Sequence, residues 1–341
     1  MDRRDRRVLV IGKNFGGAIA TLLVKNGVDV TLPYRPGGKL RPVDDVLARN
    51  LHTPTLEDFF ATEHRRFDFC VIATPMADLV GVAEKLKKTN VEIGTFVLVQ
   101  KAMDEAMRGP YAVASEVLPG AEIILCTGAA FAGDLANGCY TRMLLTHREG
   151  HCKPAEDFAR LFAGGHIQWH YYDNFEVVTV CNTVRTVTSY LLGAVTQYLR
   201  EVGLANETTL ANVVASIQGE GVEIVHALLP KLDPTFFRSK IGWIMLADMG
   251  LCQSSTSRNR AAGEDDVMRH FHGSRAGRDL GVVEALANTG VVAQGLERRP
   301  GDWMEQFPYT ASGYLFRIGT YSIEDAARKI FKRIQGDDYG S

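Results

Sequence analysis

The sequence has no excess of charge of either sign. Its 341 residues contain 38 Lys and Arg against 40 Asp and Glu, which gives a formal net charge of −2 at pH 7. This balance provides no general electrostatic attraction for nucleic acid or for an anionic membrane surface. We therefore expect no nucleic-acid partner and no membrane partner, although a local phosphate-binding pocket stays compatible with the charge.

Long hydrophobic runs are absent as well. No apolar stretch reaches the roughly 18–20 residues needed to span a bilayer. The basic residues 1–7 precede an apolar stretch that glycine interrupts, a pattern typical of a strand and a turn rather than of a secretory signal. We expect a cytoplasmic location.

Paired cysteines are also missing, because the six cysteines are scattered and form no CxxC motif. This arrangement favours reduced thiols of a cytoplasmic enzyme over a disulfide framework. No second pair of metal ligands accompanies His270 and His272 in the sequence, so we expect no metal. The cysteines are Cys70, Cys126, Cys139, Cys152, Cys181 and Cys252.

The composition is that of a soluble globular protein, with 46% hydrophobic and 23% charged residues, and the length predicts two domains. In the first half, short apolar runs alternate with helical spacing, which predicts βαβ units. We predict a Rossmann-type α/β domain with a doubly wound, mostly parallel sheet over residues 1–172. The strand-like runs are 7–12, 28–32, 67–74, 94–100 and 122–126, and the helical ones are 15–26 and 77–88.

The second half has a different character, because helical spacing continues without a clear strand. The helical stretches are 175–200, 208–229, 282–288 and 322–334, and the Pro- and Gly-bearing stretch 290–301 is typical of a loop. We predict an all-α, substrate-binding domain over residues 173–341.

A glycine-containing turn lies between the first predicted strand and the first predicted helix. Residues 12–17 (GKNFGG) have the length of a GxGxxG dinucleotide motif, with Asn14 in place of the middle glycine. Glycines at this turn let backbone N–H groups approach a pyrophosphate at the helix N-terminus. The alternative is a turn that uses glycine only for its backbone geometry. We expect Gly12, Asn14, Phe15 and Gly16 to bind a nicotinamide cofactor.

The segment after the second predicted strand bears on the choice between NAD and NADP. Residues 33–39 (PYRPGGK) contain no acid that could hold the ribose hydroxyls of NAD. Arg35 and Lys39 could instead meet the 2′-phosphate of NADP, although they could equally be solvated residues of a loop. The pattern favours NADP.

Five segments follow one another in a fixed order along the chain: 14–20 (NFGGAIA), 99–105 (VQKAMDE), 128–134 (GAAFAGD), 246–248 (LAD) with 257–260 (SRNR), and 292–295 (VAQG). Together they resemble the motifs of the NAD(P)-dependent glycerol-3-phosphate dehydrogenase family. The resemblance covers nearly the whole length and implies a Rossmann domain followed by a helical substrate domain.

The resemblance also implies roles for individual residues. Lys101 and Asp248 fall on active-site positions of the family. Arg258 and Asn259 fall on positions that hold the substrate phosphate and the cofactor, and Ala132 and Gln294 fall on cofactor contacts. The full expected cofactor site is Gly12, Asn14, Phe15, Gly16, Arg35, Pro75, Ala132, Arg258 and Gln294, and the expected substrate site is Lys101, Thr186, Arg258 and Asn259.

The departures from the family pattern mark a diverged member. The family's catalytic lysine and the asparagine after it are replaced by Arg185 and Thr186, and two family prolines are replaced by Ala129 and Tyr140. Gly12 also lies one place away from the usual glycine positions of the turn. Arginine stays protonated and cannot accept a proton, so the acid–base role falls to Lys101. Arg185 and Asp248 would then polarise or orient the substrate, or form an inert ion pair.

We therefore expect an NAD(P)-dependent oxidoreductase that interconverts a secondary alcohol and a ketone on a small phosphorylated substrate. Glycerol 3-phosphate and dihydroxyacetone phosphate are the first choice by resemblance. One alternative is another anionic hydroxy or keto substrate, a carboxylate or phosphonate of a specialised biosynthetic pathway. Another is a cofactor-binding sensor without chemistry. The expected partner is a small anionic substrate, and a homodimer stays an option.

Overall fold

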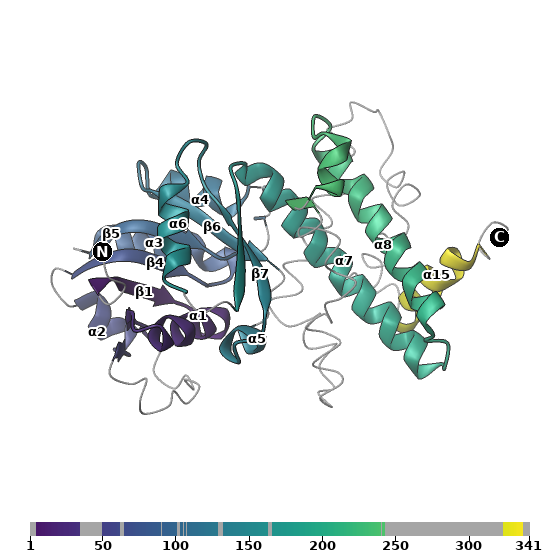
Figure 1. The fold of residues 1–341 in the computed structure, drawn as a ribbon, viewed down its shortest axis with the longest axis horizontal. Helices are drawn as coiled ribbons and strands as arrows, with labels where there is room; N and C mark the ends of the chain where they lie inside the picture. Colours follow the sequence, from purple (N-terminus) through teal and green to yellow (C-terminus); the bar gives the residue numbers. More distant parts are fainter. Residues whose placement is uncertain are drawn as a thin grey trace. The chain divides into compact units, whose positions relative to one another are not determined.

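The computed structural model describes two compact units of this chain (Figure 1). The first comprises Met1–Asp104 and Arg108–Thr179, and the second comprises Glu105–Met107 and Val180–Ser341. The compact units divide inside one long helix, while the functional boundary predicted between residues 172 and 173 stays a prediction. The described residues are 5–34, 50–61, 65–89, 91–100, 103–104, 106, 108–128, 132–162, 166–239, 241–242 and 323–336.

An eight-stranded sheet forms the centre of the first unit, in the order β3-β2-β1-β4-β5-β6-β7-β8. Neighbouring strands are parallel except β6 and β7, which are antiparallel. The first six strands have the doubly wound order of a Rossmann fold, so the predicted fold class is confirmed. The strands are β1 (Arg7–Ile11), β2 (Asp29–Thr31), β3 (Leu51–His52), β4 (Arg65–Ile72), β5 (Val91–Leu98), β6 (Ile123–Gly128), β7 (Thr141–Thr146) and β8 (Ile167–Tyr172).

Both faces of the sheet are buried, because successive side chains of the central strands alternate between two apolar clusters. Val8 and Val10 of β1 belong to one cluster, and Leu9 and Ile11 belong to the other. Helices α1 (Asn14–Lys25), α5 (Ala132–Ala136) and α6 (Lys153–Arg160) contribute to the first cluster. Helices α2 (Leu56–Ala61), α3 (Leu79–Lys88) and α4 (Pro110–Val117) contribute to the second, and a short 3-10 turn, η3 (Met76–Asp78), precedes α3.

The second unit is helical in the residues that the structure describes. It holds most of α7 (Phe175–Glu201), together with α8 (Glu207–Leu228), the short η4 (Pro234–Arg238) and α15 (Ile323–Gln335). Asn206 caps α8 by accepting a hydrogen bond from the Thr209 amide at 2.9 Å. Apolar side chains of α7, α8 and α15 form one cluster. Three of the four predicted helices are confirmed, and 282–288 and the predicted loop 290–301 lie outside the described residues.

No helix in the described ranges has the length and apolar character needed to cross a bilayer.

Candidate functional site

The turn after β1 brings the backbone of Gly12 against the end of β4. Gly12 has φ +129°, and a Cβ built on it would lie 2.3 Å from the Ala73 carbonyl oxygen. A Cβ on Gly16 would lie 3.0 Å from the Ala73 Cβ and 3.1 Å from Val10 Cγ1. The Ala73 amide donates to the Ile11 carbonyl at 2.7 Å. Gly12 is therefore required for the close approach of the turn to β4, and a side chain at Gly16 would force its neighbours to shift by a few tenths of an ångström.

This turn lies at the position where doubly wound sheets bind ligands. The chain continues from β1 to β2 on one side, while β4 pairs with β1 on the other, so the strand order reverses here. Helix α1 begins directly after the turn, at Asn14. Its first turn contains no acidic residue, and the side chain of its N-cap residue, Lys13, makes no capping hydrogen bond. Its N-terminal partial positive charge and backbone N–H groups are suited to a phosphate.

The chain segments that follow β4 and β5 form a polar corner beside this turn. Gln100 is buried, and its Nε2 donates to the carbonyl oxygens of Ile72 and Thr74, both at 3.1 Å. Gln100 Oε1 and Thr74 Oγ1 are shielded from water and have no hydrogen-bond partner in the part of the chain that the structure describes. Sequence reasoning missed this pair, although a threonine and a glutamine at the ends of the apolar runs 67–74 and 94–100 were the available signal.

The predicted cofactor residues that the structure describes all belong to the first unit. Phe15 and Ala132 pack against the cluster on the α1 face of the sheet, and Pro75 precedes the 3-10 turn at Met76–Asp78. Asn14 opens α1, but its side chain is not among those described. Arg35, Lys101, Asp248, Arg258, Asn259 and Gln294 lie outside the described residues, as does the side chain of Thr186, so their roles stay predictions.

Arg185 lies on α7 in the second unit and is only 8% exposed. Its neighbours on that helix, Val184 and Thr188, approach α8 closely, because a Cβ built on Gly221 would lie 3.5 Å from Val184 Cγ1 and 3.1 Å from Thr188 Cγ2. Glu220, directly before this glycine, is 5% exposed. Two charged side chains are thus buried on neighbouring helices, where an ion must be compensated by hydrogen bonds or opposite charge.

Sequence reasoning missed Glu220. The signal was its place in the apolar stripe of α8, since Glu220 lies three residues after Ile217 and four before Ile224, on the buried face that also carries Val213. An acid within such a stripe indicates a specific requirement rather than a solvated surface.

The buried thiols are chemically quiet. Burial raises the pKa of Cys126 to about 12 and that of Cys181 to about 12, and it raises the pKa of Cys70 further. Because the thiolate is the reactive form, these cysteines are structural. No group of three or more His, Cys, Asp and Glu suited to a metal occurs among the described residues.

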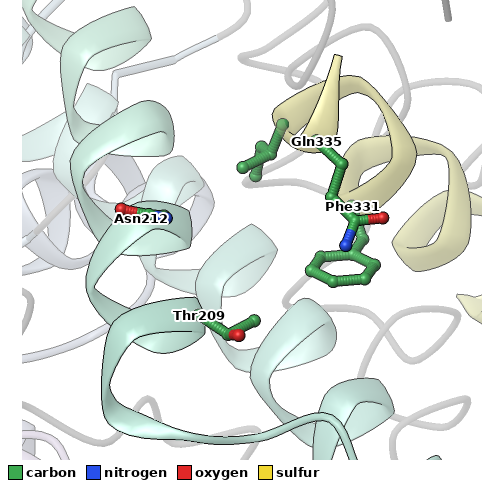
Figure 2. A pocket seen from close by; sticks show the side chains of 5 residues that line it. Thr209, Asn212, Phe331 and Gln335 are labelled. Carbon is green, nitrogen blue, oxygen red and sulfur yellow. The ribbon is translucent and has the colours of Figure 1, made fainter. Parts of the chain in front are cut away.

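A pocket of about 490 Å³ lies between α8 and α15 and is separate from the glycine turn. Figure 2 shows Thr209 and Asn212 of α8 across from Phe331 and Gln335 of α15. Its described lining contains amides, a hydroxyl and apolar side chains but no cation. The described lining therefore offers no charged group that would bind an anionic substrate.

Comparison with known proteins gives a match in structure only. No protein-family model and no curated protein sequence matches this chain. A glycerol-3-phosphate dehydrogenase from Coxiella burnetii superposes with a TM-score of 0.69 at 14% identity, over 97% of this chain and 100% of that one. The DsGPDH structure of Dunaliella salina superposes with a TM-score of 0.68 at 13% identity, over 95% of this chain but only 60% of that one.

A more distant likeness is to 2-dehydropantoate 2-reductase from Methylococcus capsulatus, with a TM-score of 0.51 at 15% identity over 93% of this chain and 98% of that one. Identities this low establish the fold and not the reaction. The chain therefore shares its fold, over nearly its whole length, with a bacterial glycerol-3-phosphate dehydrogenase.

Proposed function

We propose that this protein is a diverged member of the glycerol-3-phosphate dehydrogenase family, an oxidoreductase that uses NAD or NADP. Its reaction interconverts a secondary alcohol and a ketone on a small phosphorylated substrate, with glycerol 3-phosphate and dihydroxyacetone phosphate as the first choice. The observation that carries the proposal is the contact of Gly12 with Ala73 at the switch point of the sheet, directly before α1. The five motif segments and the fold of the Coxiella enzyme support the same reading.

The described residues fit a nicotinamide dinucleotide. Because Gly12 and Gly16 lack a Cβ, the turn packs directly against Ala73, and the backbone N–H groups at the start of α1 lie at the switch point where a pyrophosphate binds. The described residues after β2, Leu32, Pro33 and Tyr34, include no acid, which favours NADP over NAD. When bound, the nicotinamide ring supplies or takes up the hydride.

The remaining chemistry falls to side chains of this chain. Lys101 would give a proton to the carbonyl oxygen, or take it from the alcohol, through its amine. Arg185 stays charged and would orient that oxygen or an anionic group, with Asp248 opposite in charge. Arg258, Asn259 and Thr186 would hold the substrate phosphate.

Burial of Arg185 where the family has lysine favours a second candidate substrate. A guanidinium binds a carboxylate or phosphonate through two parallel hydrogen bonds, which an ammonium cannot do. The substrate would then be an anionic hydroxy or keto acid, and the shared fold with a 2-dehydropantoate 2-reductase is compatible with this.

Spectrophotometry of NADH and NADPH oxidation tests both candidates, with dihydroxyacetone phosphate and a panel of 2-keto acids as substrates. Turnover of dihydroxyacetone phosphate that survives in Arg185→Lys supports the first candidate. Turnover of a keto acid that falls at least about tenfold in Arg185→Lys, from loss of the bidentate contact, supports the second. Arg200→Lys, at an exposed position of the same helix, serves as the control. If the wild type binds cofactor but turns over neither class, the enzymatic proposal is wrong and a sensor replaces it.

A further inference from the structure

The polar corner formed by Thr74 and Gln100 contains two side-chain oxygens, Thr74 Oγ1 and Gln100 Oε1, that no contact within the described fold explains. Gln100 is 8% exposed, and its Nε2 is held by two carbonyl oxygens of the segment that leaves β4. Because both of these partners are acceptors, the amide can have only one orientation, which fixes Oε1 on the other side. Oε1 and Thr74 Oγ1 are then left without partners in the described part of the chain.

Such atoms are rare in protein interiors. A buried polar atom without a hydrogen bond lowers stability, and native proteins satisfy the great majority of them with protein, water or ligand. Valine at position 74 would avoid this penalty without losing a side-chain hydrogen bond, whereas Gln100 also holds two carbonyl oxygens through Nε2. Two unsatisfied atoms that each lie two residues beyond the end of adjacent strands, β4 and β5, therefore indicate a ligand group that supplies the missing hydrogen bonds.

The order of the strands indicates which part of a dinucleotide lies beside Thr74 and Gln100. In a doubly wound sheet the ribose of the adenosine half lies at the end of β2, and the pyrophosphate lies at the β1–α1 turn. Thr74 and Gln100 follow β4 and β5, on the opposite side of β1 from β2. They therefore face the nicotinamide half of a dinucleotide.

The chemistry of the two atoms matches a vicinal diol. Gln100 Oε1 only accepts hydrogen bonds, whereas the Thr74 hydroxyl both donates and accepts. Two neighbouring ribose hydroxyls supply one donor to the amide oxygen and a donor or acceptor to the threonine. We infer that Thr74 and Gln100 bind the hydroxyls of the ribose attached to the nicotinamide ring. This assignment rests on the proposed function, since it requires a nicotinamide dinucleotide.

Thr74→Val tests the assignment because it removes Oγ1 and keeps the shape of the side chain. Oγ1 has no partner in the described chain, so the folded protein should lose no stability. The affinity for NADH or NADPH, whichever the wild type binds more tightly, should fall about three- to tenfold for the loss of one hydrogen bond. A purely structural threonine would not combine unchanged stability with weaker binding.

Thr146→Val is the matched control. Thr146 is fully buried, and its hydroxyl is also without a partner in the described residues. Its register through β5 and β6 places it level with Ile72 but three strands from β4, about 14 Å away at the usual strand spacing. Dinucleotide affinity should not change in this variant. An equal loss in both variants would overturn the inference.

Ligand fragments, measured by isothermal titration calorimetry, identify the group that is bound. ADP lacks the second ribose, and ADP-ribose has that ribose but no nicotinamide; the forms with an adenosine 2′-phosphate replace them if NADPH is preferred. In Thr74→Val and in Gln100→Leu, ADP should bind as it does to the wild type, while ADP-ribose and the dinucleotide should bind more weakly. If the variants bind only the dinucleotide more weakly and bind ADP-ribose as the wild type does, Thr74 and Gln100 contact the nicotinamide amide, and the ribose contact is refuted.

The two proposals fail in distinguishable ways. If the wild type binds neither NADH nor NADPH, both the proposed function and the ribose assignment are wrong. If the wild type binds one of them and Thr74→Val binds it equally well, only the ribose assignment fails.

Discussion

Gly12→Ala is the most direct test of the geometry at the β1–α1 turn. The new Cβ would lie 2.3 Å from the Ala73 oxygen and 2.6 Å from the Ala73 carbonyl carbon, and the backbone would keep a φ of +129° that L-residues rarely adopt. The backbone strain costs about 1–3 kcal/mol. Forcing the turn away from β4 costs about 1–3 kcal/mol more. We expect a loss of about 2–6 kcal/mol in the free energy of unfolding of the first unit, which corresponds to roughly 4–24 °C in melting temperature.

Urea denaturation followed by circular dichroism measures the loss, and calorimetry with NADH or NADPH measures the effect on binding. Gly17→Ala is the matched control, because a Cβ on Gly17 meets no atom within 4 Å and Gly17 lies within α1. Alanine in a helix is favoured over glycine by about 1 kcal/mol, so this variant should be slightly more stable than the wild type. The argument is refuted if Gly12→Ala unfolds at the wild-type urea concentration and binds the cofactor with wild-type affinity.

Three further predictions concern buried side chains. Brief alkylation at pH 8, followed by peptide mapping, should modify the exposed Cys139 and Cys152 well before the buried Cys126 and Cys181. Equal rates of alkylation would contradict the burial. Burial raises the pKa of the Cys126 thiol from 9.0 to about 12 in the folded protein. The stability that this thiol contributes to the folded state is therefore complete below pH 9 and is lost as the pH rises toward 12. Between pH 10 and 11, the free energy of unfolding of Cys126→Ala should therefore fall less steeply than that of the wild type, and the two slopes should differ by about 1.4 kcal/mol per pH unit. Urea denaturation at a series of pH values measures both slopes. Phe158→Ala removes a fully buried ring from the cluster on the α1 face and should cost about 3–5 kcal/mol in urea denaturation, while a cost under about 1 kcal/mol would show that the site refills.

The central strands and the main helices could be predicted because their local signals agree with their place in the fold. The predicted strand at 7–12 is β1, Arg7–Ile11, and the predicted helix at 15–26 is α1, Asn14–Lys25. Strands covered on both faces are continuously apolar, and this pattern needs no knowledge of distant contacts. The same holds for α7 and α8, whose length alone separates them from strands.

The last two strands were not predicted, and their sequences explain the failure. β7 (TRMLLT) has only three successive apolar residues, and β8 (IQWHYY) alternates apolar and polar side chains, so neither strand has a long continuous apolar run. β8 lies at the edge of the described sheet and is mostly half-buried, so it needs no continuous apolar run. Helix α6 was missed for a related reason: four of its eight residues are charged, and only Ala155, Phe158 and Ala159 are buried. Tertiary contacts with the sheet decide these elements.

The candidate site was predictable only where a motif marks it. Gly12 and Gly16 could be found because a turn of this kind requires glycine within a short stretch of sequence. Thr74 and Glu220 lie in no motif, and Gln100 lies within segment 99–105 but is given no role by the family resemblance. Their significance appears only with burial and hydrogen-bond partners, which depend on strands and helices brought together by folding.

The replacement of lysine by Arg185 makes the end of β5 more important for the proposed reaction. Arginine cannot release its proton at any working pH, so proton transfer must come from another group. Gln100 donates to the carbonyl groups of Ile72, the last residue of β4, and of Thr74, which fixes the segment that leaves β5, and Lys101 is the next residue in the sequence. The same β4 exit contacts Gly12 through Ala73. A change at Gln100 should therefore alter both the proposed cofactor contact and the anchoring of the segment that carries the proposed acid–base residue, whereas Thr74→Val should alter the first alone.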